Sequence, residues 1–185
     1  MTDWDGRDYQ ARFDKLAAEG QDVHGEADFV MRYSPRSVLD AGCGSGRVAI
    51  DLARRGVDVV GADVNPSMLA VASERAPEIE WVESDLTLLD LGRSFDVVVM
   101  AGNVPLFTPA GTHAALVAGC ARHVAVDGVL VAGFQLGRGY DLADYDAHAR
   151  AAGLELAARF ATWDGDPFPG DDTYAVSVHR QQSTT

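Results

Sequence analysis

The chain has 185 residues, with 15 Lys or Arg against 28 Asp or Glu, which gives a formal net charge of −13 at pH 7. This length suits one domain with a full core. So acidic a surface repels phosphate backbones and anionic membranes, and we expect neither nucleic acid nor a membrane as a partner. Two cysteines, Cys43 and Cys120, show neither a disulfide framework nor metal-ligand spacing, which favours a cytoplasmic protein without a bound metal.

Short β-rich runs alternate with alanine-rich helical runs along most of the chain. The predicted strands are, in chain order, 37–41, 57–62, 79–82, 95–101, 129–134, 154–163 and 174–179, and the predicted helices are 47–55, 66–75, 108–124 and 142–152. Asn65 and Pro66 mark a helix start, and Asp127 and Gly128 a turn before the fifth strand. The alternation predicts a doubly wound α/β fold with a mostly parallel, seven-stranded sheet and helices on both faces. Since no helix separates the last two strands, we expect them to pair antiparallel.

A glycine-rich turn follows the first predicted strand, in the sequence Val38-Leu39-Asp40-Ala41-Gly42-Cys43-Gly44-Ser45-Gly46. Glycines let the backbone bend sharply and approach a ligand that a Cβ would block. A helix N-terminus by itself favours an anion, but Asp40 beside the turn favours a cation and repels a diphosphate. We therefore expect the turn to hold the positive end of a ligand, such as the amino acid head of a nucleoside derivative.

Acidic residues also follow the second and third predicted strands. Asp63 lies 17 residues after Gly46, where a carboxylate can accept hydrogen bonds from both ribose hydroxyls. The third strand is followed by Ser84-Asp85-Leu86, in which Asp85 could accept from an exocyclic amine while a backbone amide meets an adenine ring nitrogen. The acidic residues at three successive strand ends thus suit the successive parts of one elongated nucleoside ligand.

On these residues the chain resembles the class I S-adenosylmethionine-dependent methyltransferases, over nearly its whole length. The resemblance implies that the donor is S-adenosylmethionine, that the product is S-adenosylhomocysteine, and that residues 1–35 form a helical arm over the donor site. It further implies a Rossmann-like domain at 36–180 and a tail at 181–185. The donor-binding residues implied are Tyr9, Asp40, Gly42, Cys43, Gly44, Gly46, Asp63, Val64, Ser84, Asp85, Leu86, Gly102 and Asn103.

The methyl acceptor is less well defined. The resemblance places Ala101-Gly102-Asn103 at one wall of the acceptor pocket, but Asn103 is followed by Val104-Pro105-Leu106-Phe107 and not by the Pro-Pro-aromatic signature of amino-methylating enzymes. That argues against an adenine- or glutamine-modifying enzyme. The acidic, aromatic loop 164–173 favours a neutral or cationic small molecule. A homodimer is compatible with the sequence. Because a sulfonium methyl is already activated, no base is assigned; the candidate catalytic residues are Tyr9, His24 and Asn103.

Other interpretations stay open at this point. Residues 44–49 also satisfy the looser dinucleotide-binding pattern G-x-G-x-x-A. The same turn could hold S-adenosylmethionine or its demethylated product without catalysis, in a sensor or a partner subunit. Asp85 could simply cap a turn.

Overall fold

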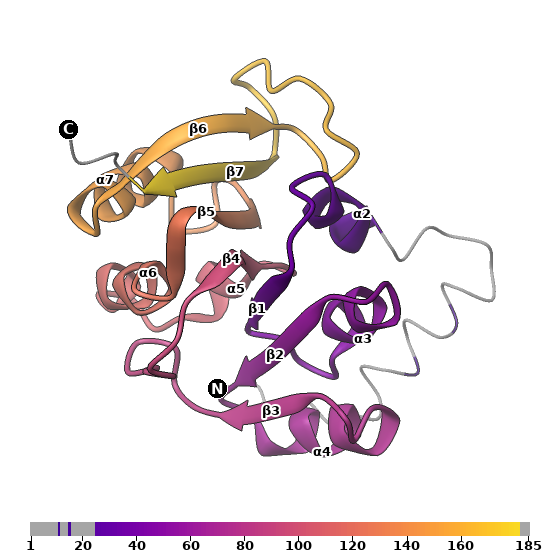
Figure 1. Ribbon diagram of the computed structural model, residues 1–185. Helices are drawn as coiled ribbons and strands as arrows, with labels where there is room; N and C mark the ends of the chain where they lie inside the picture. The colour runs from indigo at the N-terminus through magenta and orange to yellow at the C-terminus, as the bar shows by residue number, and fades with distance from the viewer. Residues whose placement is uncertain (1–10, 12–14, 16–24, 182–185) are drawn as a thin grey trace.

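The computed structural model describes Ala11, Lys15 and residues 25–181. The strands in this part are β1 (Ser37–Ala41), β2 (Asp58–Asp63), β3 (Glu80–Glu83), β4 (Phe95–Met100), β5 (Val124–Gln135), β6 (Leu154–Phe160) and β7 (Tyr174–Gln181). The helices are α2 (Gly25–Met31), α3 (Arg47–Arg54), α4 (Pro66–Arg75), α5 (Val104–Phe107), α6 (His113–Ala121) and α7 (Leu142–Ala151). All the strands join one seven-stranded sheet in the order β3-β2-β1-β4-β5-β7-β6 (Figure 1).

The sheet is parallel from β3 to β5. β7 runs antiparallel to both of its neighbours, β5 and β6. The doubly wound α/β fold with an antiparallel last strand is therefore confirmed. The insertion of β7 between β5 and β6, which leaves β6 at the sheet edge, goes beyond what the sequence pattern predicted.

Apolar side chains that alternate along the strands fill a core on each face of the sheet. On β4, Val97 and Val99 belong to the core that includes side chains of α2 and α3, whereas Val98 and Met100 belong to the core that includes side chains of α6 and α7. In Figure 1, α6 and α7 lie to the left of the sheet and α2 and α3 to the right. Strands buried on both faces explain why the β-rich runs are almost continuously apolar. Within the described residues, no helix is both long and apolar enough to cross a bilayer.

The helix predicted at 108–124 is wrong in its extent. The structure has a short helix before it, α5, and begins α6 only at His113. Pro105 fits in the first turn of α5 because the first amides of a helix need no intrahelical acceptor. Pro109 and Gly111, the latter with φ 85°, then separate the two helices.

The predicted turn at Asp127 and Gly128 is instead an irregularity inside β5. The strand starts at Val124, and its register with β4 shifts between the pairs Phe95–Val124 and Val97–Val129. Asp127 takes a positive φ of 64°, and a Cβ on Gly128 would lie 2.9 Å from the carbonyl oxygen of Asp96. The left-handed backbone that the turn signal implied is therefore present at Asp127, but pairing with β4 resumes at Val129, so these residues form a bulge within one strand.

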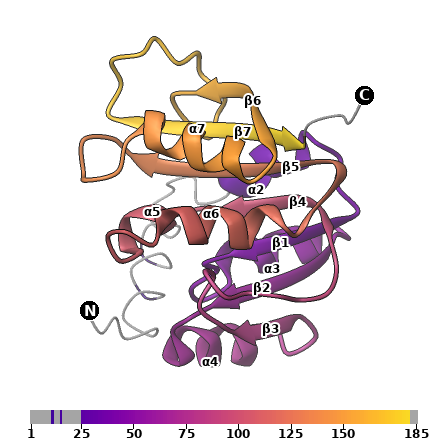
Figure 2. The ribbon, with the colours of Figure 1, turned by 90° about the vertical axis from the view of Figure 1, so that its left-hand side faces the viewer.

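The parallel strands all end on the same side of the sheet, across the strand direction. We call this side, where their carboxyl ends lie, the carboxyl edge. Figure 2 shows this edge on the left, where the arrowhead of β5 and helix α5 lie. Because β7 is antiparallel, its first residue, Tyr174, pairs with Gln135 at the end of β5 and also lies at this edge. The residues after β1, β2, β3 and β4 meet here too, which brings together most of the predicted site.

Candidate functional site

The glycine turn after β1 is fastened to the end of β2. The amides of Gly42 and Cys43 donate to the carbonyl oxygen of Ala62 at 2.8 and 3.1 Å. The amide of Gly44 donates to Asp63 Oδ2 at 2.8 Å, and the amide of Asn65 donates to Asp63 Oδ1 at 2.9 Å. A carboxylate thus occupies an amide that a phosphate-binding loop would offer to its ligand, so the turn is poorly suited to a diphosphate.

Asp40 lies under the same turn and is almost completely buried, with 1% of its surface exposed. Its Oδ2 accepts from the amide of Ala49 at 3.1 Å. Burial raises the pKa of Asp40 from 3.8 to about 7; the Ala49 amide and the Arg47 charge lower it, while Asp63 and Glu26 raise it further. A cationic group bound nearby would favour the ionised carboxylate and relieve this cost.

Two of the turn glycines are required by contacts within the protein. A Cβ on Gly46, where φ is 79°, would lie 2.5 Å from Cη2 of Trp81, and a Cβ on Gly42 would lie 2.5 Å from Cγ2 of Val104. The Trp81 ring also covers Gly61, and its Nε1 donates to the carbonyl oxygen of Ala76 at 2.9 Å. Sequence reasoning assigned these glycines to a ligand; the structure adds close packing as a second reason for them.

Cys43, in the same turn, is a buried free thiol. Burial raises the pKa of this thiol well above its ordinary value, and the charges of Asp40 and Asp63 act in the same direction. The group is therefore a neutral thiol at physiological pH and not an activated nucleophile.

The residues predicted to bind adenine include an exposed side chain and side chains that already make contacts within the protein. Val64 is 61% exposed, so its side chain is available to a flat ring. Asp85 Oδ1 accepts from the amide of Thr87 at 2.9 Å and from its hydroxyl at 2.8 Å, which is the turn-capping arrangement considered from the sequence. Ser84 donates its amide to the carbonyl oxygen of Asp63 at 3.0 Å, and Leu86 is buried in the core. The adenine role of these residues stays a prediction.

Asn103 connects the loop after β4 to the end of β5. Its backbone is left-handed, with φ 66°; its amide N–H donates to the carbonyl oxygen of Gly133 at 3.3 Å, and its Oδ1 accepts from the amide of Gln135 at 2.8 Å. Gly102 beside it is exposed, with open space where a Cβ would be. Since a carboxamide does not titrate at physiological pH, Asn103 is not a general base.

Two pairs of side chains at the carboxyl edge were not predicted. Arg47, in the first turn of α3, forms a bidentate ion pair with Glu26 of α2, at 2.9 and 2.6 Å. Trp163 donates from Nε1 to the hydroxyl oxygen of Tyr174 at 3.0 Å. Burial raises the pKa of Tyr174 to about 12, so its hydroxyl stays protonated. Arg47 follows the glycine turn directly, but only the folded chain shows its partner.

The remaining predicted candidates, Tyr9 and His24, lie outside the described residues, and their roles stay predictions. Among the described residues, no group of three or more His, Cys, Asp or Glu side chains could hold a metal ion.

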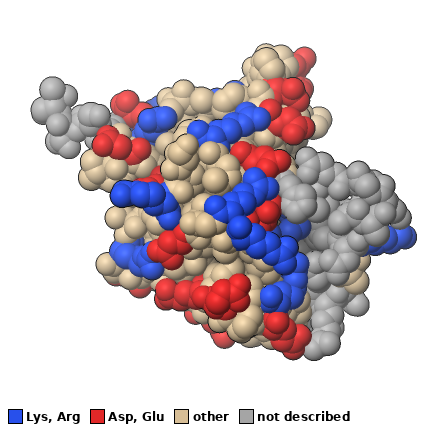
Figure 3. All heavy atoms as spheres, turned by 45° about the vertical axis from the view of Figure 1, so that its right-hand side comes forward, with Lys and Arg blue, Asp and Glu red and all other residues tan. Residues whose placement is uncertain are grey.

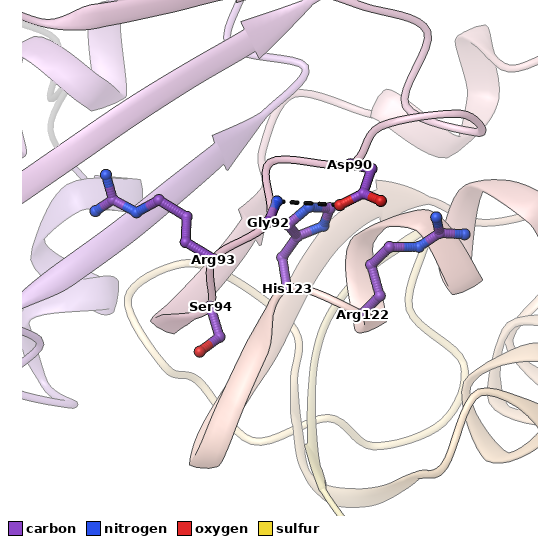
Figure 4. A pocket seen from close by; sticks show the side chains of 6 residues that line it. All are labelled: Asp90, Gly92, Arg93, Ser94, Arg122 and His123. Carbon is purple, nitrogen blue, oxygen red and sulfur yellow. Dashed lines mark hydrogen bonds between the residues drawn. The ribbon is translucent and has the colours of Figure 1, made fainter.

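A cavity of about 370 Å³ lies at the opposite edge of the sheet, before β4 and β5 (Figure 4). His123 lines it, but its Nδ1 is 2.8 Å from the carbonyl oxygen of Gly119 and its Nε2 accepts from the amide of Leu91 at 3.0 Å. Asp90, another lining residue, accepts from the amide of Gly92 at 3.0 Å. With both ring nitrogens engaged, His123 has a structural role and lies away from the predicted site.

Comparison with known proteins identifies the family. Residues 38–128 match the family described as "Methyltransferase domain". The solved structure of a TehB-like SAM-dependent methyltransferase from Corynebacterium glutamicum is 36% identical, with a TM-score of 0.90, and the match covers 96% of this chain and 98% of that one. The chain belongs to the S-adenosylmethionine-dependent methyltransferases. This confirms the class I resemblance and argues against the dinucleotide interpretation.

Curated relatives match over shorter stretches. The magnesium-protoporphyrin O-methyltransferase of Rhodobacter capsulatus is 40% identical over 67 residues, which are 34% of this chain and 30% of that protein. The trans-aconitate 2-methyltransferase of Azoarcus sp. is 30% identical over 143 residues, which are 76% of this chain and 53% of that protein. The chain thus spans between about a third and about half of the length of these relatives. Both relatives are named as methyltransferases, and the acceptors in their names differ.

Proposed function

We propose that this methyltransferase transfers a methyl group from S-adenosylmethionine to a small-molecule acceptor and releases S-adenosylhomocysteine. The observation that carries the proposal is the pairing of Asp63 Oδ2 with the amide of Gly44, above a buried Asp40. Two carboxylates at the glycine turn make the local field negative, which suits a ligand that carries an ammonium and a sulfonium and disfavours one with a diphosphate.

The residues along the carboxyl edge divide the binding of the donor among them. In this proposal, Asp40, Gly42, Cys43 and Gly44 hold the amino acid end, and Gly46 supports the turn. When bound, S-adenosylmethionine supplies a methyl that is already activated by its sulfonium. The protein then has to align the reactants and exclude water, which can provide most of the rate enhancement without a strong general acid.

The nucleoside part of the donor fits the next two strand ends. Asp63 retains lone pairs on both oxygens for the ribose hydroxyls, although each oxygen already accepts one amide. Val64 provides an exposed apolar surface for adenine. Ser84, Asp85 and Leu86 form the turn at its rim, and Asp85 Oδ2 is the atom we assign to the exocyclic amine. Gly102 and Asn103 form the far wall, beside the transferred methyl.

We further propose that the acceptor is neutral or cationic. The loop 164–173 carries Asp164, Asp166, Asp171 and Asp172. Asp172 Oδ2 is buried and has no hydrogen-bond partner among the described residues. A neutral or cationic acceptor with an N–H or O–H group could donate to this oxygen, whereas an anion without such a group could not. Relatives named for magnesium-protoporphyrin and trans-aconitate support a small molecule as the acceptor.

The wider context of the protein is also proposed. In this proposal residues 1–35 cover the donor, with Tyr9 reaching the donor and His24 the acceptor, and the tail begins after Gln181, which is the last residue of β7. On the face in Figure 3, acidic and basic side chains are interspersed. Elsewhere in the contacts of the described chain, Arg55 pairs with Asp51 at 2.8 Å. Interspersed charges and a net charge of −13 favour a cytoplasmic protein that does not bind nucleic acid. A homodimer remains compatible with this proposal.

The proposal is tested by calorimetry with S-adenosylmethionine, S-adenosylhomocysteine and a nicotinamide dinucleotide, followed by release of S-adenosylhomocysteine over a panel of small molecules. We expect the first two ligands to bind and the dinucleotide not to bind, with turnover on neutral or cationic acceptors. Binding of the dinucleotide in place of the donor would refute the assignment. Donor binding with no turnover on any acceptor would favour a sensor or partner subunit instead.

A further inference from the structure

Two hydrogen-bond donors at the carboxyl end of β5 have no acceptor in the described part of the protein. The first is the Nδ2 group of Asn103. Because Oδ1 accepts from the amide of Gln135 at 2.8 Å, this hydrogen bond fixes the orientation of the carboxamide and leaves Nδ2 as the atom that does not face Gln135. A carboxamide nitrogen offers two N–H donors and accepts nothing.

The second donor is the hydroxyl of Tyr174. Its oxygen accepts from Nε1 of Trp163 at 3.0 Å, which leaves its own proton to be donated elsewhere. Burial keeps this proton in place by raising the pKa of Tyr174 to about 12. The hydroxyl oxygen lies 2.7 Å from the position that a Cβ on Gly133 would occupy. Glycine at 133 therefore makes room for both the hydroxyl and the Trp163 ring.

Both donors are anchored to the same short stretch of β5. Asn103 binds the carbonyl oxygen of Gly133 and the amide of Gln135, and Tyr174 pairs in register with Gln135 while its hydroxyl reaches the face of Gly133. One nearby pair of charges, Glu26 and Arg47, is joined in a bidentate ion pair, so these two charges offset each other. The stretch thus presents N–H and O–H donors beside this ion pair.

The order of the strands places these donors on the acceptor side. The sheet runs β3, β2, β1, β4, β5, and the proposed adenine, ribose and amino acid sites follow β3, β2 and β1 in that order. The next positions along the carboxyl edge, after β4 and β5, therefore flank the transferred methyl. This step rests on the proposed function.

We propose that Asn103 and Tyr174 are specificity-determining residues that hold a neutral oxygen of the acceptor, in a carbonyl or hydroxyl group, by donating hydrogen bonds from Nδ2 and from the phenol. This assigns a substrate class to the site: molecules whose oxygen accepts hydrogen bonds next to the atom that is methylated. It also assigns both residues to binding and orientation, and neither to proton abstraction.

The experiment uses the full chain saturated with S-adenosylhomocysteine and three matched probes: benzamide, benzyl alcohol and toluene. A benzene ring suits the aromatic surroundings, since the Trp163 ring lies at Gly133. Dissociation constants are measured by saturation-transfer NMR titration. We expect the two oxygen-bearing probes to bind at least about fivefold more tightly than toluene, the effect of about one neutral hydrogen bond.

Two variants remove one donor each. Asn103→Asp keeps the Oδ1 atom that accepts from Gln135 but replaces the N–H donors with a carboxylate oxygen, and Tyr174→Phe removes the hydroxyl. Each variant should raise the dissociation constants of benzamide and benzyl alcohol by about fivefold or more, and should leave that of toluene within about twofold of the wild-type value. A role limited to folding would weaken all three probes together.

Matched controls come from the same chain. Tyr140→Phe removes a hydroxyl that already lies 2.8 Å from Nδ1 of His148, and Asn65→Asp adds the same charge at a helix cap that accepts Asp equally well. Neither should change the preference for oxygen-bearing probes. If toluene binds as tightly as benzamide, or if both variants bind all probes as the wild type does, the inference is refuted. Absence of S-adenosylhomocysteine binding in the first titration would instead overturn the proposed function, and this inference with it.

Discussion

Replacing Asp40 with Asn should stabilise the ligand-free protein above neutral pH while it weakens donor binding. The wild-type carboxyl has a pKa of about 7 in the fold against 3.8 ordinarily, chiefly because of burial. Between these two pH values the unfolded chain has lost the proton and the folded protein retains it, so the free energy of unfolding falls as the pH rises. Above about pH 7 this loss is complete.

The size of the effect follows from the shift. A difference of about three pKa units corresponds to about 4 kcal/mol, which is an upper limit because relaxation around the ionised carboxylate reduces it. Asparagine keeps an oxygen that can accept from the amide of Ala49 and carries no charge to bury. We therefore expect the variant to match the wild type near pH 4 and to exceed its stability by about 1 to 4 kcal/mol at pH 8.

Urea denaturation of both proteins from pH 4 to pH 8 measures this difference directly. Asp90→Asn is a suitable control, because Asp90 lies in an exposed turn and accepts from the amide of Gly92 at 3.0 Å. Calorimetry with S-adenosylhomocysteine at pH 8 should show a loss of about 1.5 to 3 kcal/mol for Asp40→Asn, since the ammonium loses its charged partner. A stability difference that does not change with pH would refute the reasoning about burial.

Three further substitutions test separate parts of the site. Asp63→Ala should weaken S-adenosylhomocysteine by about 1.5 to 3 kcal/mol in calorimetry, the cost of losing a charged hydrogen-bond partner; unchanged affinity would contradict the ribose assignment. Gly46→Ala should destabilise the fold by about 1 to 3 kcal/mol in thermal or urea unfolding, because its Cβ would lie 2.5 Å from the Trp81 ring. If the Gly46→Ala variant is as stable as the wild type, the Trp81 ring moves aside without a cost in free energy. Asp85→Ala should lower the free energy of unfolding by about 1 kcal/mol because the turn cap is lost, and the affinity for adenosine should fall as well. If the variant binds adenosine normally, Asp85 has only the capping role.

The sequence alone predicted most of the fold because its signals are local. Strand 37–41 was predicted with its observed bounds, and the helix start at Asn65 was correct because the Asn65 side chain accepts from the amides of Ser67 and Met68. A cap and a proline act within one helical turn, so they can be recognised without tertiary contacts. The predicted bounds of the fifth strand, 129–134, were wrong because pairing with other strands decides where that strand begins and ends. Val124–Gln135 is one strand because β4 pairs with it on both sides of the bulge, at Val124 and again from Val129, while β7 pairs with it from Val129 to Gln135.

The site was predicted in part for the same reason. The acids and glycines after each strand could be placed at one edge, since parallel strands bring their carboxyl ends together. The contacts between them could not be predicted. Asp63 accepts from Gly44, 19 residues away, and Glu26 pairs with Arg47, 21 residues away, at separations that obey no local period.

What the sequence by itself determined is the succession of strands and helices and the kinds of residue at each strand end, because these depend on short-range periodicity and on the backbone preferences of Gly, Pro and Asn. Only the tertiary structure decided which donors and acceptors remain available to a ligand. Asn103 and Tyr174 show why: a polar group is free or engaged according to its neighbours in space, and those neighbours come from strands that are distant in the chain.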